Sequence, residues 1–205
     1  MTDSCDRQKT ISPEFSHILI QSAIELLGRD DLLHVLKQAY LGGWLDSAPS
    51  VIRGLTMAEY HCFQDDMISI FGKLSAQGLM QRIGRIVFCK MRRRIERIKN
   101  LGSIEHRMTP LSRRLQADLG ELGKILENSL DCTLSAQSTG KDWQITLSGC
   151  PGEREYSSLS CYLIKGLLQE FLEWSDSRKD FRMEELVTSN DAESCIFKIQ
   201  VLVPE

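Results

Sequence analysis

The chain changes its hydrophobic periodicity once, near Asp131, and this change divides it into two parts. Before Asp131, apolar residues recur at helical spacing; after it, short stretches alternate between apolar and polar residues. Chains in which helices come first and strands later fold as α+β domains with an antiparallel sheet, not as doubly wound parallel sheets. We therefore predict an α+β fold with a polar tail over residues 1–14 and helices over residues 15–130. A β-β-α-β-β part of the same domain should occupy residues 131–205.

Local signals place the helices of the first part. Gly28 is suited to end a first helix, and Thr56 followed by Glu59 is a capping-box pattern that opens another. A long helix is expected from about residue 75 to residue 99. A further amphipathic helix should start after Pro110, because proline suits the first helical turn.

Two hairpins with a helix between them are expected in the second part. The first hairpin should turn at residues 139–142, where turn-forming residues separate two alternating stretches. An amphipathic helix follows over residues 159–174. The second hairpin should turn at residues 190–191, and the alternation that begins at residue 195 predicts a last strand with one buried face.

Composition and motifs exclude several classes of function. The 205 residues carry a net charge of −3, so the whole chain has no nucleic-acid signature. No apolar run approaches the roughly 20 residues that span a bilayer, and the polar N-terminus lacks a secretory signal, which favours the cytoplasm. No phosphate-binding loop, dinucleotide fingerprint, H-E-x-x-H or G-x-S-x-G motif is present. We therefore expect a binding protein rather than an enzyme.

A basic stretch from Arg82 to Lys99 is the strongest charge feature. It holds eight lysines and arginines and a single acidic residue, Glu96. Such a stretch can bind an anionic partner, or it can be the solvated face of a long helix with cations near its C-terminus. The second interpretation is favoured, because no recognised nucleic-acid-reading motif accompanies the charges.

Cysteines and one glutamate suggest a metal site. None of the seven cysteines forms a C-x-x-C pair. If the second hairpin pairs as predicted, Glu184 and Cys195 lie near each other, and Cys161 at the start of the preceding helix can pack against the same end. Zinc accepts sulfur and oxygen ligands in tetrahedral geometry. Buried core thiols are the alternative interpretation.

The same region resembles the 4-vinyl-reductase-like domain family. The resemblance is carried by three segments: Cys161-Tyr-Leu-Ile-Lys-Gly-Leu-Leu-Gln-Glu-Phe-Leu, Phe181-Arg-Met-Glu184 and Asp191-Ala-Glu-Ser-Cys195-Ile-Phe-Lys-Ile. It implies the ligand-binding fold of the NO-signalling and Golgi-transport type, shared with sensory domains of aromatic-hydrocarbon-responsive regulators and with TRAPP small subunits. The resemblance also implies that helices and sheet form a shell around an apolar pocket and that the protein is a homodimer.

The resemblance also implies a structural zinc. Its ligand positions correspond to Cys161, Glu184, Val187 and Cys195, and a valine cannot bind metal. Either Cys150 replaces it as a ligand, or the zinc is absent and the thiols pack in the core.

For the pocket, the resemblance implicates Trp143. Helical apolar residues that could face the same space complete the candidate set: Phe63, Met67, Phe71, Met80 and Phe88. The predicted function is a standalone, non-catalytic module that binds or senses a hydrophobic small molecule. Two alternatives stay open: a tetrapyrrole-handling protein of (bacterio)chlorophyll synthesis or photosystem assembly, and a dimeric protein-interaction scaffold.

Overall fold

The structure is a computed structural model. It describes residues 10–38, 41–45, 53–101, 103, 108–140, 142–149, 159–177, 179–186 and 194–202. The helices are α1 Pro13–Leu27, α2 Arg29–Gln38, the short 3-10 helix η1 Gly42–Trp44, α3 Met57–Phe71, α4 Lys73–Arg94, α5 Glu96–Leu101, α7 Leu111–Leu130 and α8 Leu159–Ser175. The strands are β1 Thr133–Thr139, β2 Asp142–Ser148, β3 Asp180–Leu186 and β4 Ser194–Leu202. This order confirms the predicted α+β fold with helices first and a β-β-α-β-β part last.

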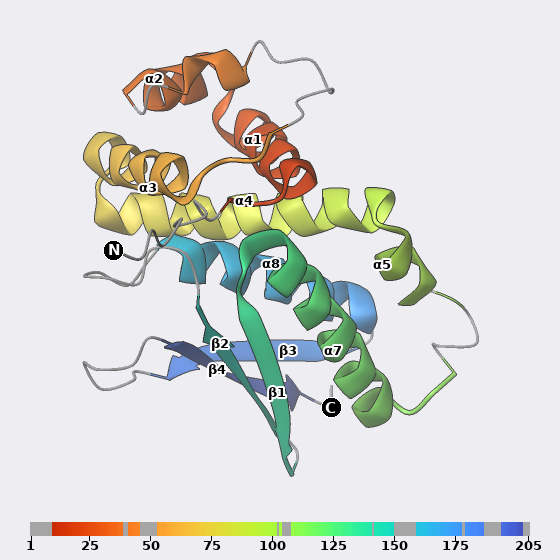
Figure 1. Cartoon of the computed structure of the whole chain (residues 1–205). Helices are drawn as coiled ribbons and strands as arrows, with labels where there is room; N and C mark the ends of the chain where they lie inside the picture. Colours follow the sequence, from red (N-terminus) through yellow and green to blue (C-terminus); the bar gives the residue numbers. More distant parts are fainter. Residues whose placement is uncertain are drawn as a thin grey trace, which may run out of the picture.

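The elements are arranged in layers around two long helices (Figure 1). Helices α4 and α8 run side by side, and α1, α2 and α3 lie on the far side of α4. The sheet lies beyond α8, while α7 runs along β1. Helix α8 is therefore the element between the helical layer and the sheet.

The sheet is antiparallel throughout, with the strand order β1-β2-β4-β3. Strand β1 pairs with β2 and strand β3 pairs with β4, and the pairing of β2 with β4 joins the two ladders. The register places Ile145 opposite Phe197, and both side chains are fully buried. Residues one position away, such as Thr146 and Lys198, stay partly exposed. One face of the sheet is therefore apolar and covered, as strand alternation requires.

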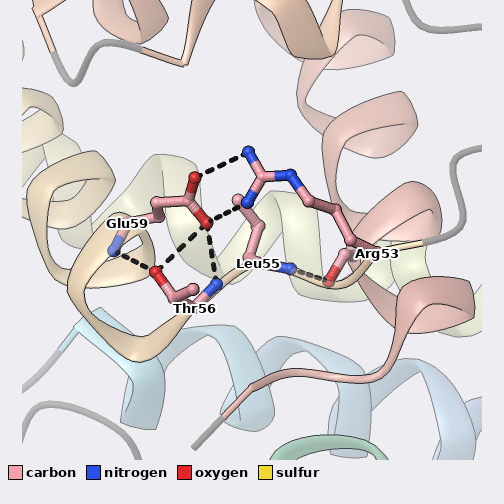
Figure 2. Close-up of polar contacts among 5 residues, drawn as sticks. Arg53, Leu55, Thr56 and Glu59 are labelled. Atoms are coloured by element: carbon pink, nitrogen blue, oxygen red, sulfur yellow. Dashed lines mark hydrogen bonds and ion pairs between the residues drawn. The ribbon is translucent and has the colours of Figure 1, made fainter. Parts of the chain in front are cut away.

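Side-chain caps fix the starts of α1 and α3. The backbone N–H of Phe15 donates to the Ser12 hydroxyl, which caps α1. At α3, the N–H of Glu59 donates to the Thr56 hydroxyl, and the Glu59 carboxylate accepts from the Thr56 N–H (Figure 2). The predicted capping box is therefore confirmed, and it satisfies two backbone N–H groups that would otherwise lack partners.

Two glycines bring the backbones of α4 and α8 into contact. A Cβ atom placed on Gly84 would lie 1.9 Å from the carbonyl oxygen of Leu163, and one placed on Gly166 would lie 1.8 Å from the carbonyl oxygen of Gln81. Real Cβ atoms do not approach other atoms this closely. Any other residue at these positions would force the helices apart.

The predicted helix over residues 75–99 is wrong at its end. Helix α4 closes at Arg94, and Ile95 is extended, with φ −87° and ψ 112°. Its N–H still donates to the Met91 carbonyl, and a new short helix, α5, begins at Glu96. Ile98, on this new helix, is buried.

Candidate functional site

The pocket residues predicted from sequence are core residues, and the structure divides them between two sides of α8. Phe63, Met67, Met80 and Phe88, on α3 and α4, are all fully buried. Trp143 is 4 % exposed and lies on β2, on the sheet side of α8 (Figure 1). Each of these residues lies on the kind of element predicted for it, a helix or a strand, and their contact with a ligand stays a prediction.

The remaining candidate, Phe71, is the last residue of α3 and is only partly buried. Phe88, on α4, packs edge-on against Phe171 of α8, with ring centroids 5.7 Å apart. Trp174 of α8 also meets Phe88, at 5.8 Å. An aromatic cluster therefore joins α4 to the C-terminal half of α8.

A buried polar cluster joins α3 to the first turn of α8. The Gln64 side-chain amide donates to the Ser160 hydroxyl at 2.8 Å, and that hydroxyl donates to the Tyr60 hydroxyl at 3.3 Å. Tyr60 is fully buried, Ser160 is 2 % exposed and Gln64 is 6 % exposed. Buried polar groups of this kind are retained when they are hydrogen-bonded, and they fix orientation where a ligand or a helix must be positioned.

A second buried polar cluster joins α7 to the C-terminal end of α8. Arg114 is 4 % exposed and donates to the Ser175 carbonyl at 2.8 Å, while Asp118, at 1 % exposure, accepts from the Ser175 hydroxyl. Asp176 lies 3.6 Å from the same guanidinium. Our sequence reasoning missed this cluster. The signal was available, because Arg114 and Asp118 are four residues apart on the otherwise leucine-rich face of α7.

The predicted zinc site is wrong, although two of its residues do meet. Cys161 and Cys195 form a disulfide, with their Cα atoms 6.4 Å apart. Within the described residues, no group of three or more histidines, cysteines or acidic residues could hold a metal ion. Cys150 and Val187 lie outside the described residues.

The sheet register explains why Glu184 does not join the two cysteines. Glu184 pairs with Lys198 across β3 and β4, and Cys195 pairs with Leu147 across β2 and β4. Cys195 and Lys198 are three positions apart, so their side chains point to opposite faces of the sheet. The Glu184 carboxylate is therefore on the outer face, where it accepts from the Arg182 side chain at 2.9 Å.

The basic stretch is partly neutralised by its neighbours. Lys90 pairs with Glu25 at 2.7 Å, and Arg85 pairs with Glu170 at 3.0 Å. Arg94 donates to the neutral Gln21 amide. Burial lowers the pKa of the nearby His17, and the positive charges of Arg94 and Lys90 lower it further. This distribution agrees with the interpretation as a solvated helix face.

Over the described part of the chain, no helix is long and apolar enough to cross a membrane.

Comparison with solved structures identifies the fold. A mutant of the T. Tengcongensis H-NOX domain matches 95% of this chain and 99% of its own, with a TM-score of 0.67 and 15% identity. An H-NOX structure from a study of H-NOX activation covers 93% and 96%, with a TM-score of 0.63 and 14% identity. An oxygen-binding H-NOX domain related to soluble guanylate cyclases, in its oxygen complex, covers 91% and 93%, with a TM-score of 0.60 and 14% identity. No protein-family profile and no curated protein matches the chain.

These matches correct the predicted kinship. The similar structures are H-NOX domains, so the assignment to the 4-vinyl-reductase-like family and its relatives is wrong. The predicted fold of the NO-signalling type agrees with them. The predicted cofactor is also wrong: the zinc group is not formed by the described residues, and the group under study in a similar H-NOX structure is heme. At this level of identity, the matches show a shared fold.

Proposed function

We propose that this chain is a non-catalytic domain of the H-NOX fold that binds or senses a hydrophobic small molecule. The observation that carries the proposal is the match over nearly the whole length of both chains to domains described as oxygen-binding and as studied for heme distortion. A whole-length match places the same layers in the same order. It thereby supports a binding role for this chain.

The interior chemistry supports an apolar ligand. Among the described residues, the buried side chains are overwhelmingly aliphatic and aromatic, so a bound molecule would be held by burial, at about 25 cal/mol per Å² of apolar surface removed from water. Buried methionines on α3 and α4, Met67 and Met80, are suited to repacking around a guest because the thioether chain is flexible. The Tyr60, Gln64 and Ser160 cluster offers one polar contact point within this apolar space.

Native mass spectrometry of the full chain, purified without detergent, tests the proposal. A bound hydrophobic molecule at one per chain is the expected result. Substitution of a buried side chain should then change occupancy, and Met80→Trp, which puts a larger side chain into the packed core, should lower it. Gly78→Ala, on the exposed side of the same helix, is the matched control and should leave occupancy unchanged. A chain that always carries no small molecule would contradict the proposal.

The dimeric scaffold is the second candidate. It is favoured by the completeness of the packing, because many interior side chains expose no surface at all. A scaffold needs no internal space and would act through its surface. The same mass spectra separate the two functions: a ligand-free homodimer favours the scaffold, and a ligand-bound chain favours the sensor.

A further inference from the structure

We infer that this chain does not hold heme inside its H-NOX fold, and that its ligand belongs to the class of apolar molecules bound without a metal–protein bond. The part that concerns ligand class rests on the function proposed above. The part that concerns heme rests only on the donor groups and the packing of the described residues.

The described histidines cannot bind a heme iron in the interior. His34 on α2 and His61 on α3 are exposed, and His17 on α1 is only partly buried. Histidine is the proximal ligand in many heme proteins, and it must project from a wall of the heme pocket. Helix α7, the only described helix that runs along β1, contributes leucines to the interior: Leu115, Leu119, Leu122 and Leu126.

Five other side chains of iron-binding types are fully buried, and they lie in filled space. Cysteine, methionine and tyrosine can each bind heme iron, and Cys132, Met67, Met80, Met91 and Tyr60 are all fully buried. A side chain with no accessible surface borders neither solvent nor an internal space large enough for water. None of these five side chains therefore faces a gap into which a porphyrin could be inserted without displacing its neighbours.

The packing around α4 and α8 is closed on both sides. On the helical side, Phe15, Phe63, Ile83 and Phe88 expose at most 1 % of their surface. On the sheet side, the side chains that cover α8 are fully buried as well: Ile145, Leu147, Phe197 and Ile199. Interiors packed in this way resemble organic crystals, with few voids larger than a water molecule.

Backbone contact removes the remaining freedom at the centre. Gly84 and Gly166 hold α4 and α8 so close that neither position has room for a methyl group. A planar macrocycle cannot enter between two helices whose backbones touch. To enter the interior anywhere else, the macrocycle would have to displace side chains that now have complete van der Waals contact.

A ligand that does bind must therefore replace side-chain contacts by its own apolar surface. Its affinity would come from burial and from one hydrogen-bonding position, the Tyr60, Gln64 and Ser160 cluster, and not from coordination. Flexible, mostly aliphatic molecules fit this requirement better than a rigid macrocycle, because they can occupy space released by rotamer changes of Met67 and Met80.

Heme reconstitution of the full chain tests the inference. The chain is expressed with a heme precursor in the medium, titrated with hemin after purification and passed through gel filtration. An H-NOX domain that is known to bind heme is processed in parallel as the positive control. The readouts are the Soret absorbance, the heme-to-chain ratio and induced circular dichroism in the Soret region. His106→Ala is included, because His106 lies outside the described residues.

We expect less than one-tenth of a heme per chain after gel filtration, no induced circular dichroism, and the same result for His106→Ala. Heme retained at one per chain with an induced Soret signal would overturn the inference, and loss of that signal in His106→Ala would identify the iron ligand. A heme content below one per chain, without an induced Soret signal, supports the inference. The two proposals fail in different ways. A chain loaded with heme would refute this inference and leave the sensor function in place. A chain that carries no molecule at all would refute the sensor function and leave this inference in place.

Discussion

Substitution of Gly84 by alanine should separate α4 from α8 and destabilise the whole domain. The added methyl group would lie 1.9 Å from the Leu163 carbonyl oxygen and 2.9 Å from the Leu167 backbone nitrogen. Ordinary Cβ contacts are 3.4–4 Å. Both obstructing atoms belong to the backbone, so no side-chain rotation relieves the clash, and the helices must move apart.

The magnitude follows from two opposing effects. Overpacking of a filled core costs about 1–3 kcal/mol, occasionally more, and contact with backbone places Gly84→Ala at the upper end of that range. Alanine recovers roughly 1 kcal/mol through its higher helix propensity. We therefore expect a net loss of about 2 kcal/mol in the free energy of unfolding. In a chain of 205 residues this corresponds to a fall in Tm of roughly 4–8 °C.

Gly78→Ala is the matched control, since it makes the same chemical change on the same helix. Gly78 is exposed, and a Cβ there would meet nothing within 4 Å. Only the gain from the higher helix propensity of alanine remains, so this variant should be more stable than the parent by up to about 1 kcal/mol. Urea unfolding followed by circular dichroism measures both variants. Equal stability of Gly84→Ala and Gly78→Ala would refute the close approach of α4 and α8.

Three further results are expected. Reduction of the Cys161–Cys195 bond, which spans 34 residues, should remove about 4 kcal/mol of stability by chain entropy; scanning fluorimetry with and without reductant measures this, and an unchanged Tm would show that no bond had formed. Burial raises the pKa of Glu59, but hydrogen bonds from Arg53 and Thr56 outweigh it and lower that pKa below its ordinary 4.5. Glu59→Gln should therefore be less stable than the parent at pH 7, with the difference vanishing as the pH falls through the lowered pKa; a pH-independent difference would exclude the charge as its cause. Burial lowers the pKa of His17, and the positive charges of Arg94 and Lys90 lower it further. The midpoint of the His17 titration, measured by NMR, should therefore lie below pH 6.5, and Arg94→Ala should shift that midpoint upward.

Helix caps and strand alternation were predictable because they depend on neighbouring residues. The capping box of Thr56 and Glu59 needs only the correct spacing of two side chains. The buried face of β4 follows from the period of two that any strand has. The break at Ile95 was not predictable in this way, because α4 and α5 show no proline or glycine at the junction.

The metal site shows how far local reasoning extends. The sequence correctly suggested that Cys161 and Cys195 approach each other, because a helix start and a strand start share one end of the layered fold. The face on which Glu184 lies depends on the register of β3 against β4. A shift of one residue in register moves every side chain to the other face, and no local pattern of residues determines that register.

The order of helices and strands, the caps, the buried face of each strand and the absence of familiar catalytic motifs are properties of the amino-acid sequence itself, since each depends on residues within a few positions of one another. The contact of Gly84 with α8, the buried cluster around Arg114 and the close packing of the described side chains around α4 and α8 were decided by the tertiary structure. Each joins segments separated by tens of residues, and an isolated glycine or a polar residue on a helix does not reveal its partner. The physical reason is that close packing depends on the shapes of both surfaces, and the sequence of one surface specifies only half of that contact.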